Sequence, residues 1–224
     1  IEGLREYQEY DIALLQDAIL DSMCNDEWPV RLLSDLLIDI RNGWSGKQHP
    51  SVPEVGVLRL SCVHSKSIDL QDVKVARIAP EVAARFHLKK DDVFIVRGNG
   101  SQSLVGRSAI SEKDSTNVIF NDLLIRLRFC ADVMPSFANY LFHTKKIRRQ
   151  IIDAAKTAAG IWKINQKGLS RLQFPCPGID VQSTFVHEAA TVLEYCSQLA
   201  HNIKISDIQH LRESILHKAF AGEL

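Results

Sequence analysis

The C-terminal part of the chain carries its strongest hydrophobic pattern. No glycine or proline occurs between Gly178 and Gly222. Apolar residues recur four and three positions apart, at Phe185, Ala189, Val192, Cys196, Leu199 and Ile203, and after a phase shift at Ile208, Leu211, Ile215 and Ala219. This spacing predicts one helix with an apolar stripe for another helix. Over residues 180–224 the helix is expected to reach on the order of 60 Å, so part of it needs a partner; packing on the chain's own core is the alternative.

A second helix is predicted at the other end, over residues 3–23, with Ile12, Leu15, Ile19 and Met23 on one face. Residues 211–216 (LRESIL) also repeat the pattern of residues 15–20 (LQDAIL). The offset is far longer than the period of a solenoid repeat. The repeat favours a longer alternation of helices and globular inserts, and chance similarity between two amphipathic helices is the alternative.

Short strands dominate the region between these helices. Alternating or apolar runs predict strands within residues 30–40, 55–63, 93–96, 104–110, 118–120, 123–129 and 161–164. Helices are expected at residues 80–86 and 136–155, polar loops at 41–50 and 97–103, and a turn at 165–168. The pattern predicts an α+β fold: a helix in residues 1–24, a globular mixed domain with short strands in 25–178, and a long helix in 179–224.

Composition excludes some classes of protein. The 224 residues are 46% hydrophobic, without an apolar run long enough for a membrane span. The five cysteines are odd in number and show no Cys-x-x-Cys spacing, so reduced thiols in a cytoplasmic protein are expected rather than zinc or disulfides. The N-terminus is acidic, without the features of a signal peptide, and it lacks an initiator methionine, as expected of a fragment or a processed chain.

Charge is unevenly distributed although the formal net charge is zero. The first 28 residues hold eight acids and one base, which leaves 19 acids and 26 bases in the remainder. A surplus of about +7 can supply phosphate contacts and attract an anionic partner. A mildly basic solvated surface explains it equally well.

Catalytic motifs are missing. The sequence has no phosphate-binding loop of the Gly-x-x-x-x-Gly-Lys type, no dinucleotide fingerprint and no His-x-x-x-His pair. Asp91, Asp92, Glu112 and Lys113 could be combined into the metal site of a nuclease, but their spacing and context do not favour it. We expect no catalytic residues, no metal and no cofactor.

Recognition chemistry is present instead. Gly98 and Gly100 allow the backbone of residues 97–103 to approach a groove closely. Asn99 and Gln102 can pair with adenine edges, and arginines with guanine edges or phosphates. The candidate DNA-binding residues are Lys47, Arg97, Asn99, Ser101, Gln102, Ser103, Arg107, Lys145, Lys146, Arg149, Trp162, Lys163, Asn165, Gln166 and Lys167. An ordinary polar hairpin and a basic stretch late in a helix are the alternatives.

Several motifs follow one another along the chain: residues 28–32 (WPVRL), 40–43 (IRNG), 88–98 (LKKDDVFIVRG), 105–109 (VGRSA), 167–170 (KGLS), 174–177 (FPCP) and 214–224 (SILHKAFAGEL). Their order resembles that of the specificity subunits of type I restriction–modification systems. The last motif is close to the ending of the long helices in that family, and the others resemble parts of its recognition domain. Residues 180–182 (DVQ) depart from the family's usual Glu-Gln, and residues 25–26 lack the tail that ends the second helix.

The resemblance implies a non-catalytic subunit of a restriction and methylation complex. One target-recognition domain would read half of a split DNA target, and the two helices would form an antiparallel coiled coil that serves as spacer and as dock for methylation subunits, and through them the restriction subunit. Pairing with itself is an alternative to being half of a full subunit. The residues expected at the partner-helix interface are Ile12, Leu15, Ile19, Val192, Leu199, Ile203, Leu211, Ile215 and Phe220.

Two other functions stay open from the residues alone. In the first, the paired helices form a protein–protein scaffold whose globular domain does not bind DNA. In the second, the acidic residues form a metal-dependent nuclease. Salt-dependent DNA affinity without cleavage separates the DNA-reading function from both.

Overall fold

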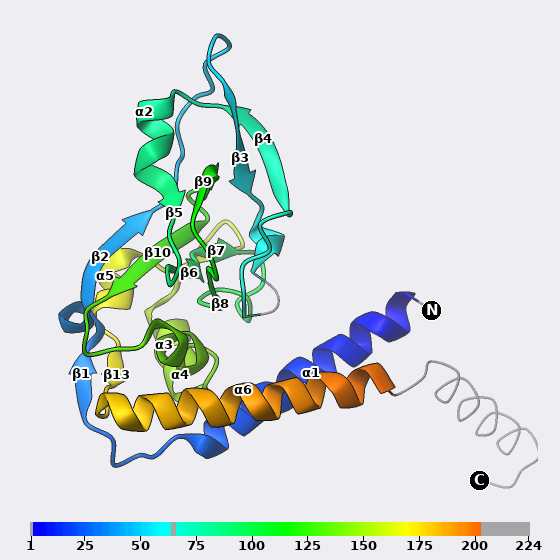
Figure 1. Cartoon of the computed structure of the whole chain (residues 1–224), viewed down its shortest axis with the longest axis vertical. Helices are drawn as coiled ribbons and strands as arrows, with labels where there is room; N and C mark the ends of the chain where they lie inside the picture. Colours follow the sequence, from blue (N-terminus) through cyan, green and yellow to red (C-terminus); the bar gives the residue numbers. More distant parts are fainter. Residues whose placement is uncertain (1, 64–65, 203–224) are drawn as a thin grey trace, which may run out of the picture.

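The computed structural model describes residues 2–63 and 66–202, with the backbone alone for residues 2–12, 158 and 199–202. A globular body of small sheets stands on two long helices (Figure 1). The helices are α1 (Glu2–Met23), α2 (Pro80–Ala83), α3 (Pro135–Leu141), α4 (Lys145–Ala154), α5 (Gln166–Ser170) and α6 (Ile179–Asn202). The described residues also contain three 3₁₀ helices: η1 (Leu33–Leu36), η2 (Leu60–Cys62) and η3 (Ala84–Phe86). The expected mixed α+β architecture with flanking helices is confirmed.

Four small sheets make up the body. The first is antiparallel, in the order β2 (Leu37–Asn42), β10 (Leu124–Phe129), β6 (Val93–Val96), β8 (Ser108–Ile110). The second has the order β4 (Val73–Arg77), β3 (Glu54–Leu58), β9 (Ser115–Ile119), β5 (His87–Leu88), with β3 and β9 parallel. The third has the order β11 (Lys156–Ala158), β12 (Ile161–Lys163), β7 (Gly98–Asn99), and the fourth pairs β1 (Val30–Leu32) with β13 (Gln173–Pro175).

Both faces of the first sheet are covered. Ile125 and Leu127 belong to the largest core cluster, together with residues of α3, α4 and α6. Leu124 faces the opposite way, into a second cluster around Phe94 and Phe120, whose rings meet edge to face at 5.0 Å. Successive side chains of a strand point to opposite faces. The face of β10 toward the core helices is therefore apolar, with Ile125 and Leu127, whereas the opposite face carries Arg126 and Arg128 beside Leu124.

Two glycines permit close packing in the body. A Cβ on Gly43 would lie 2.0 Å from the backbone oxygen of Asn121, so only glycine fits where β2 leaves the first sheet. Gly106 has φ +79° and lies under Ile151, whose Cγ2 would be 2.4 Å from an added Cβ. The positive φ excludes residue 106 from the strand expected at 104–110, because only glycine adopts that conformation readily; the strand β8 begins later, at Ser108.

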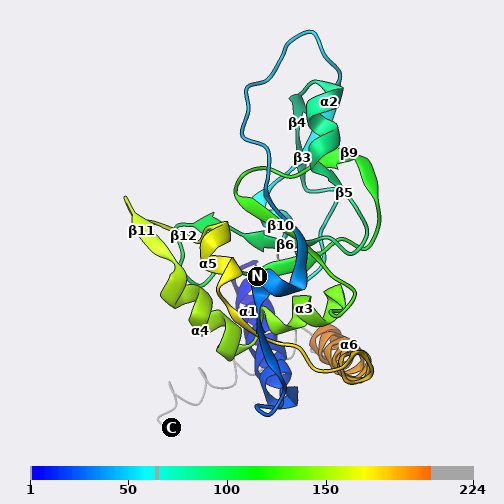
Figure 2. The same ribbon diagram turned by 90° about the vertical axis from the view of Figure 1, so that its left-hand side faces the viewer.

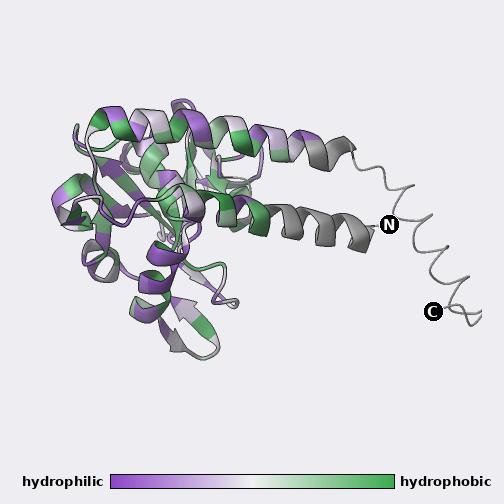
Figure 3. Ribbon diagram, turned by 90° about the horizontal axis from the view of Figure 1, so that it is seen from below, coloured by the Kyte–Doolittle hydropathy of each residue, from purple (hydrophilic) through white to green (hydrophobic). Residues whose placement is uncertain are grey.

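The terminal helices lie side by side and run in opposite directions (Figures 1 and 3). A hydrogen bond from Gln16 Nε2 to Ser197 Oγ, 3.4 Å long, joins them. Part of the stripe on α6 is buried at Phe185, Ala189 and Cys196, with Leu193 buried where Val192 was expected. Phe185, Ala189 and Leu193 belong to the main core cluster together with Phe137 of α3. The first half of α6 thus serves the chain's own core, which was the alternative expectation for the stripe.

Other local expectations were wrong. The single helix expected over 136–155 is two helices, because buried His143 and Thr144 leave the helical path and the Thr144 hydroxyl bonds the Leu141 carbonyl at 2.7 Å. Residues 165–168 were expected to turn but begin α5, capped by Asn165. The strand β4 was not foreseen, and the strand expected at 55–63 ends at Leu58 and continues as η2. The break after α3 and the start of α5 involve side-chain hydrogen bonds that span three residues, which apolar periodicity does not report.

Acidic residues of α1 join it to the body. Asp17 lies 3.3 Å from Lys66 Nζ, and Asp26, in the turn after α1, accepts a hydrogen bond of 2.9 Å from Lys146 Nζ. Asp21 Oδ1 accepts a hydrogen bond of 2.6 Å from the backbone N–H of Lys145, the first residue of α4. The N-terminus of a helix favours negative charge. Three of the eight acids in the first 28 residues, Asp17, Asp21 and Asp26, are therefore engaged within the chain.

The burial of His143 makes the stability of the fold depend on pH. Its Nε2 lies 3.0 Å from the Ser108 carbonyl oxygen and its Nδ1 lies 3.7 Å from Asp17. Burial, reinforced by the charge of Lys66, holds the pKa of His143 well below its ordinary 6.5. The unfolded chain therefore takes up a proton below about pH 6.5 that the folded chain excludes, and stability falls as the pH drops.

Between pH 6.5 and pH 5 we expect the free energy of unfolding to fall less steeply with pH in a His143→Gln variant than in the parent. The difference in slope should be up to about 1.4 kcal/mol per pH unit. Urea unfolding at each pH measures the slope, which is independent of any constant loss of stability in the variant. His187→Gln removes an exposed histidine from α6 and should keep the parent slope. Equal slopes in the parent and His143→Gln would contradict the assignment.

Candidate nucleic-acid interface

Two of the expected recognition segments share one sheet. Antiparallel pairing places Trp162 opposite Asn99 and Lys163 opposite Gly98, and the Ile164 N–H bonds the Arg97 carbonyl at 2.9 Å. The hairpin of β11 and β12 extends this sheet away from the body, beside α4 (Figure 2). The loop at 97–103 and the segment around Trp162, far apart in the sequence, are therefore neighbours in space.

The register sorts the side chains of this sheet by face. Thr157, Trp162 and Asn99 are cross-strand partners and lie on one face, whereas Lys156 and Lys163 lie on the other. Trp162 is half-buried against the main core cluster, so its ring also anchors the hairpin. Both lysines are exposed, and neither forms an ion pair with the described residues. The sheet thus offers an amide on one face and two cations on the other.

Helix α4 braces the loop that leads back from β7. Arg148 donates hydrogen bonds to the carbonyls of Val105 at 2.6 Å and Ser103 at 2.8 Å. Burial, together with the charge of Arg107, lowers the pKa of Arg148 to about 10. A guanidinium that fixes two loop carbonyls limits the conformations of the loop, so its polar groups are held in place before a ligand arrives.

Several candidate residues are partly engaged within the chain. Asn99 Oδ1 accepts a hydrogen bond from Ser101 N at 2.8 Å, and the hydroxyls of Ser101 and Ser103 lie 2.8 Å apart. Arg97 Nη1 donates to the Asp122 carbonyl at 3.1 Å and lies 3.8 Å from its carboxylate. No hydrogen bond to a described residue involves the side chain of Gln102, which keeps both its amide donor and its acceptor available.

The remaining candidates divide between capping and open positions. Asn165 caps α5 by accepting a hydrogen bond of 2.8 Å from the Gly168 N–H. Gln166 and Lys167 follow it in α5, with Lys167 exposed. Arg107 is half-buried near Arg148, and Lys47 is exposed in the loop between β2 and β3, outside the third sheet.

The basic cluster at residues 145–149 begins a helix rather than ending one, because the expected long helix is broken before Lys145. Lys145 Nζ lies 3.6 Å from Asp21, and Lys146 pairs with Asp26. Arg149 is exposed, and no ion pair joins it to the described residues. Of the cluster, Arg149 is therefore the cation that the fold leaves most available to an outside anion.

Lys156 was not among the candidate cations expected from the sequence, and the structure does not support the alternative of a nuclease metal site. Lys156 lies across from Lys163, and only the pairing of β11 with β12 identifies it. Asp92, a candidate for a nuclease site, is 1% exposed and bonds Arg128 and the Lys89 N–H. Among the described residues, no group of three or more His, Cys, Asp or Glu side chains could hold a metal ion.

The residues expected at the partner-helix interface are only partly visible. Leu15 is 53% exposed, and Ile19 and Val192 are half-buried. For Ile12 and Leu199 the structure describes the helical backbone but not the side chain, and Ile203, Leu211, Ile215 and Phe220 lie outside the described residues. None of the described helices is long and apolar enough to cross a membrane.

Comparison with known proteins links this geometry to one family, although no family model matches the chain. The chain is 27% identical over 192 residues to the specificity subunit of the type I restriction enzyme EcoKI from Escherichia coli K12, covering 84% of this chain and 41% of the relative. It is 26% identical over 200 residues to the StySPI specificity subunit of Salmonella potsdam, covering 88% and 43%. The chain thus spans about two-fifths of the length of these relatives.

The fold agrees with the sequence matches. The crystal structure of the HsdS subunit from Thermoanaerobacter tengcongensis superposes with a TM-score of 0.61 at 18% identity, over 99% of this chain and 54% of that one. At that identity the superposition shows a common fold. Sequence and fold together confirm the expected resemblance: this chain is similar to the type I restriction enzyme specificity subunits, and its size corresponds to one target-recognition domain.

Proposed function

We propose that the chain recognises DNA sequence-specifically as part of a type I restriction–modification complex. Its body, residues 25–178, reads one half of a bipartite target, and it performs no catalysis of its own. The observation that carries this proposal is the third sheet, which joins Asn99, Trp162 and Lys163 beside a braced polar loop, in a relative of specificity subunits. Base edges are read by side-chain amides, and cations neutralise phosphates.

The two helical segments, residues 1–24 and 179–224, act in this proposal as spacer and docking surface. Apolar side chains on their described parts stay open: Leu14, Leu15, Val181 and Tyr195 are each between 45% and 61% exposed. Exposed apolar groups on helices are typical of surfaces that bind other proteins. The methylation subunits, and through them the restriction subunit, are the proposed partners in the cytoplasm. Coiled-coil packing of the two helices is part of the same proposal.

The test is selection of binding sites from random duplexes by the full chain in complex with its methylation subunit. A short half-site should be enriched. Lys163→Ala should weaken binding to all duplexes about equally and reduce the salt slope by about one, because one phosphate contact is lost. Gln102→Ala should weaken the preferred site by about tenfold and leave other sites unchanged, because the amide reads a base.

Lys74→Ala serves as the control, since Lys74 is an exposed lysine on β4 in the second sheet. It should leave both the affinity and the salt slope unchanged. Absence of any enriched site at low salt would refute the proposal. A stable complex with the methylation subunit but no salt-dependent DNA affinity would favour the protein scaffold instead.

A further inference from the structure

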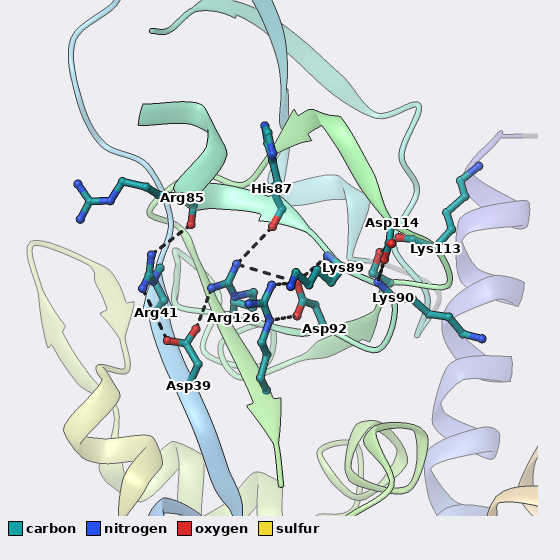
Figure 4. A network of polar contacts seen from close by, with 12 residues as sticks. Asp39, Arg41, Arg85, His87, Lys89, Lys90, Asp92, Lys113, Asp114 and Arg126 are labelled. Atoms are coloured by element: carbon teal, nitrogen blue, oxygen red, sulfur yellow. Dashed lines mark hydrogen bonds and ion pairs between the residues drawn. The ribbon is translucent and has the colours of Figure 1, made fainter. Parts of the chain in front are cut away.

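A cavity opens between the first two sheets, on the side away from the core helices. Its volume is about 530 Å³. Its lining comes from β2, η3, β5, β9, β10 and the turns next to β5 and β9, and includes Asp39, Arg41, Lys89, Asp114, Arg126 and Arg128. Figure 4 shows the polar groups at its base, with the side chains of Asp39 and Arg126 turned toward each other. None of the expected DNA-binding residues lines it.

Strand register concentrates arginines on the floor of the cavity. Arg126 of β10 is paired across the sheet with Arg41 of β2, and Arg128 with Asp39. Two guanidinium groups on directly opposed positions repel each other, which costs stability unless an anion lies between or beside them. The sequence shows only two arginines alternating with apolar residues along β10, a pattern also expected of a solvated strand face.

The carboxylates available do not balance these arginines. Asp92 is 1% exposed and uses both oxygens on Arg128, one of them at 3.0 Å, while it also accepts the Lys89 N–H at 2.8 Å. Asp39 bonds Arg126 Nη2 at 2.8 Å and lies 3.8 Å from Arg41 Nη2. Three guanidinium groups thus share two carboxylates, and the network carries one net positive charge.

Hydrogen-bond donors on the floor are also left over. Arg126 is 3% exposed, yet its buried Nε has no hydrogen-bond partner. Arg41 Nη1 bonds only the Arg85 carbonyl, at 3.2 Å. Buried polar groups are nearly always hydrogen-bonded, so an orphaned guanidinium donor calls for an explanation. The exposed Lys89 and Arg85 at the opening add two cations, against the single carboxylate of Asp114.

We propose that this cavity binds an oxyanion of the phosphate class through Arg41 and Arg126, with Lys89 at the opening. Guanidinium groups bind phosphate oxygens through charge-assisted hydrogen bonds, and a bound anion would offset the excess charge of the network. The cavity is larger than one phosphate group, so the phosphate can belong to a larger molecule. Its source is a phosphodiester of DNA or a free phosphate compound, and only the DNA source rests on the proposed function.

The test measures binding of inorganic phosphate to the full chain at pH 7.5 by calorimetry, and by the unfolding temperature at up to 10 mM phosphate against chloride of equal ionic strength. Arg41→Gln should weaken phosphate binding by at least about tenfold, because a charge-assisted hydrogen bond is lost. Lys89→Gln should weaken phosphate binding several-fold. Because Lys89 is exposed, this variant tests the site even if Arg41→Gln fails to fold.

Arg59→Gln is the matched control. Arg59 resembles Arg41 in bonding one carbonyl, that of Val73 at 3.3 Å, and in lying 3.6 Å from one carboxylate, that of Asp72, but it lies outside the cavity. Its phosphate affinity should equal that of the parent. The general stabilisation of proteins by phosphate salts is the same in all variants and cancels in the comparison.

Binding to a random duplex then separates the two sources. If the cavity holds a DNA phosphate, Arg41→Gln also weakens duplex binding and reduces the salt slope by about one. If it holds a free phosphate compound, duplex binding is unchanged while phosphate binding falls. A protein that binds phosphate but no DNA would refute the proposed function and keep this inference. No phosphate binding by the parent, or equal binding by the parent, Arg41→Gln and Lys89→Gln, would overturn it.

Discussion

Replacing Asp92 by alanine should lower the free energy of unfolding by about 3–5 kcal/mol, because it leaves the partly buried Arg128 without its counter-charge and the buried Arg126 with Asp39 alone. Asp92 bonds Arg128 through both oxygens and lies 4.0 Å from Arg126. Its hydrogen bonds to Arg128, together with its charge, also raise the pKa of that guanidinium. Neither arginine can lose its proton at neutral pH, so the variant must bury uncompensated charge or open the first sheet to water.

Urea unfolding of the parent and Asp92→Ala measures this loss. Asp132→Ala is a matched control, since Asp132 also pairs with an arginine, Arg31, at 2.8 Å, but on the surface. Exposed pairs contribute little, so this variant should unfold close to the parent. Equal losses in the two variants would show that burial does not determine the value of the pair. The result also bears on the nuclease hypothesis, because the expected defect concerns folding and not cleavage.

Replacing Phe137 by alanine should destabilise the protein by about 3–5 kcal/mol, the usual cost of removing a buried aromatic ring. Phe137 is fully buried at the junction of α3 with α6, where its ring lies 5.7 Å from that of Trp28 and 5.2 Å from that of Phe185. The cavity left behind would loosen α6 from the body, because Phe185 loses its main aromatic neighbour on α3.

Urea unfolding gives the size of the effect, and amide hydrogen exchange shows where it falls. Protection should decrease first in the first half of α6. Tyr195→Ala removes an aromatic ring from the same helix at a position that is 61% exposed, and should change stability by less than about 0.5 kcal/mol. A Phe137→Ala variant as stable as Tyr195→Ala would mean that α6 does not depend on this contact.

Local pattern was sufficient for much of the fold. The helix at residues 3–23, the short helix at 80–86 and the strands at 93–96 and 123–129 were expected and are present. Hydrophobic periodicity and the absence of glycine and proline act within a few residues, so they can be read without knowing the fold. The order of the motifs likewise led to the family, which the sequence relatives support.

Pairing between distant segments could not be read in this way. No local signal places Trp162 opposite Asn99, since the register of a sheet depends on the whole body around it. The pairing of Lys145 and Lys146 with α1 was hidden for the same reason, and these lysines were expected to face DNA. Only the structure distinguishes them from Arg149, Lys156 and Lys163, which stay available.

By itself, the sequence determined the α+β class, the two terminal helices and the resemblance to type I specificity subunits, because these depend on short-range periodicity and on the order of motifs. The tertiary structure decided which polar groups bond other groups of the chain and which remain for a ligand. It turned Arg126 inward, because β10 is covered on both faces by other elements, and it buried Asp92, which precedes β6, against Arg128. The sequence gives the charge of each side chain, but its partners depend on packing between segments that meet only in the folded protein.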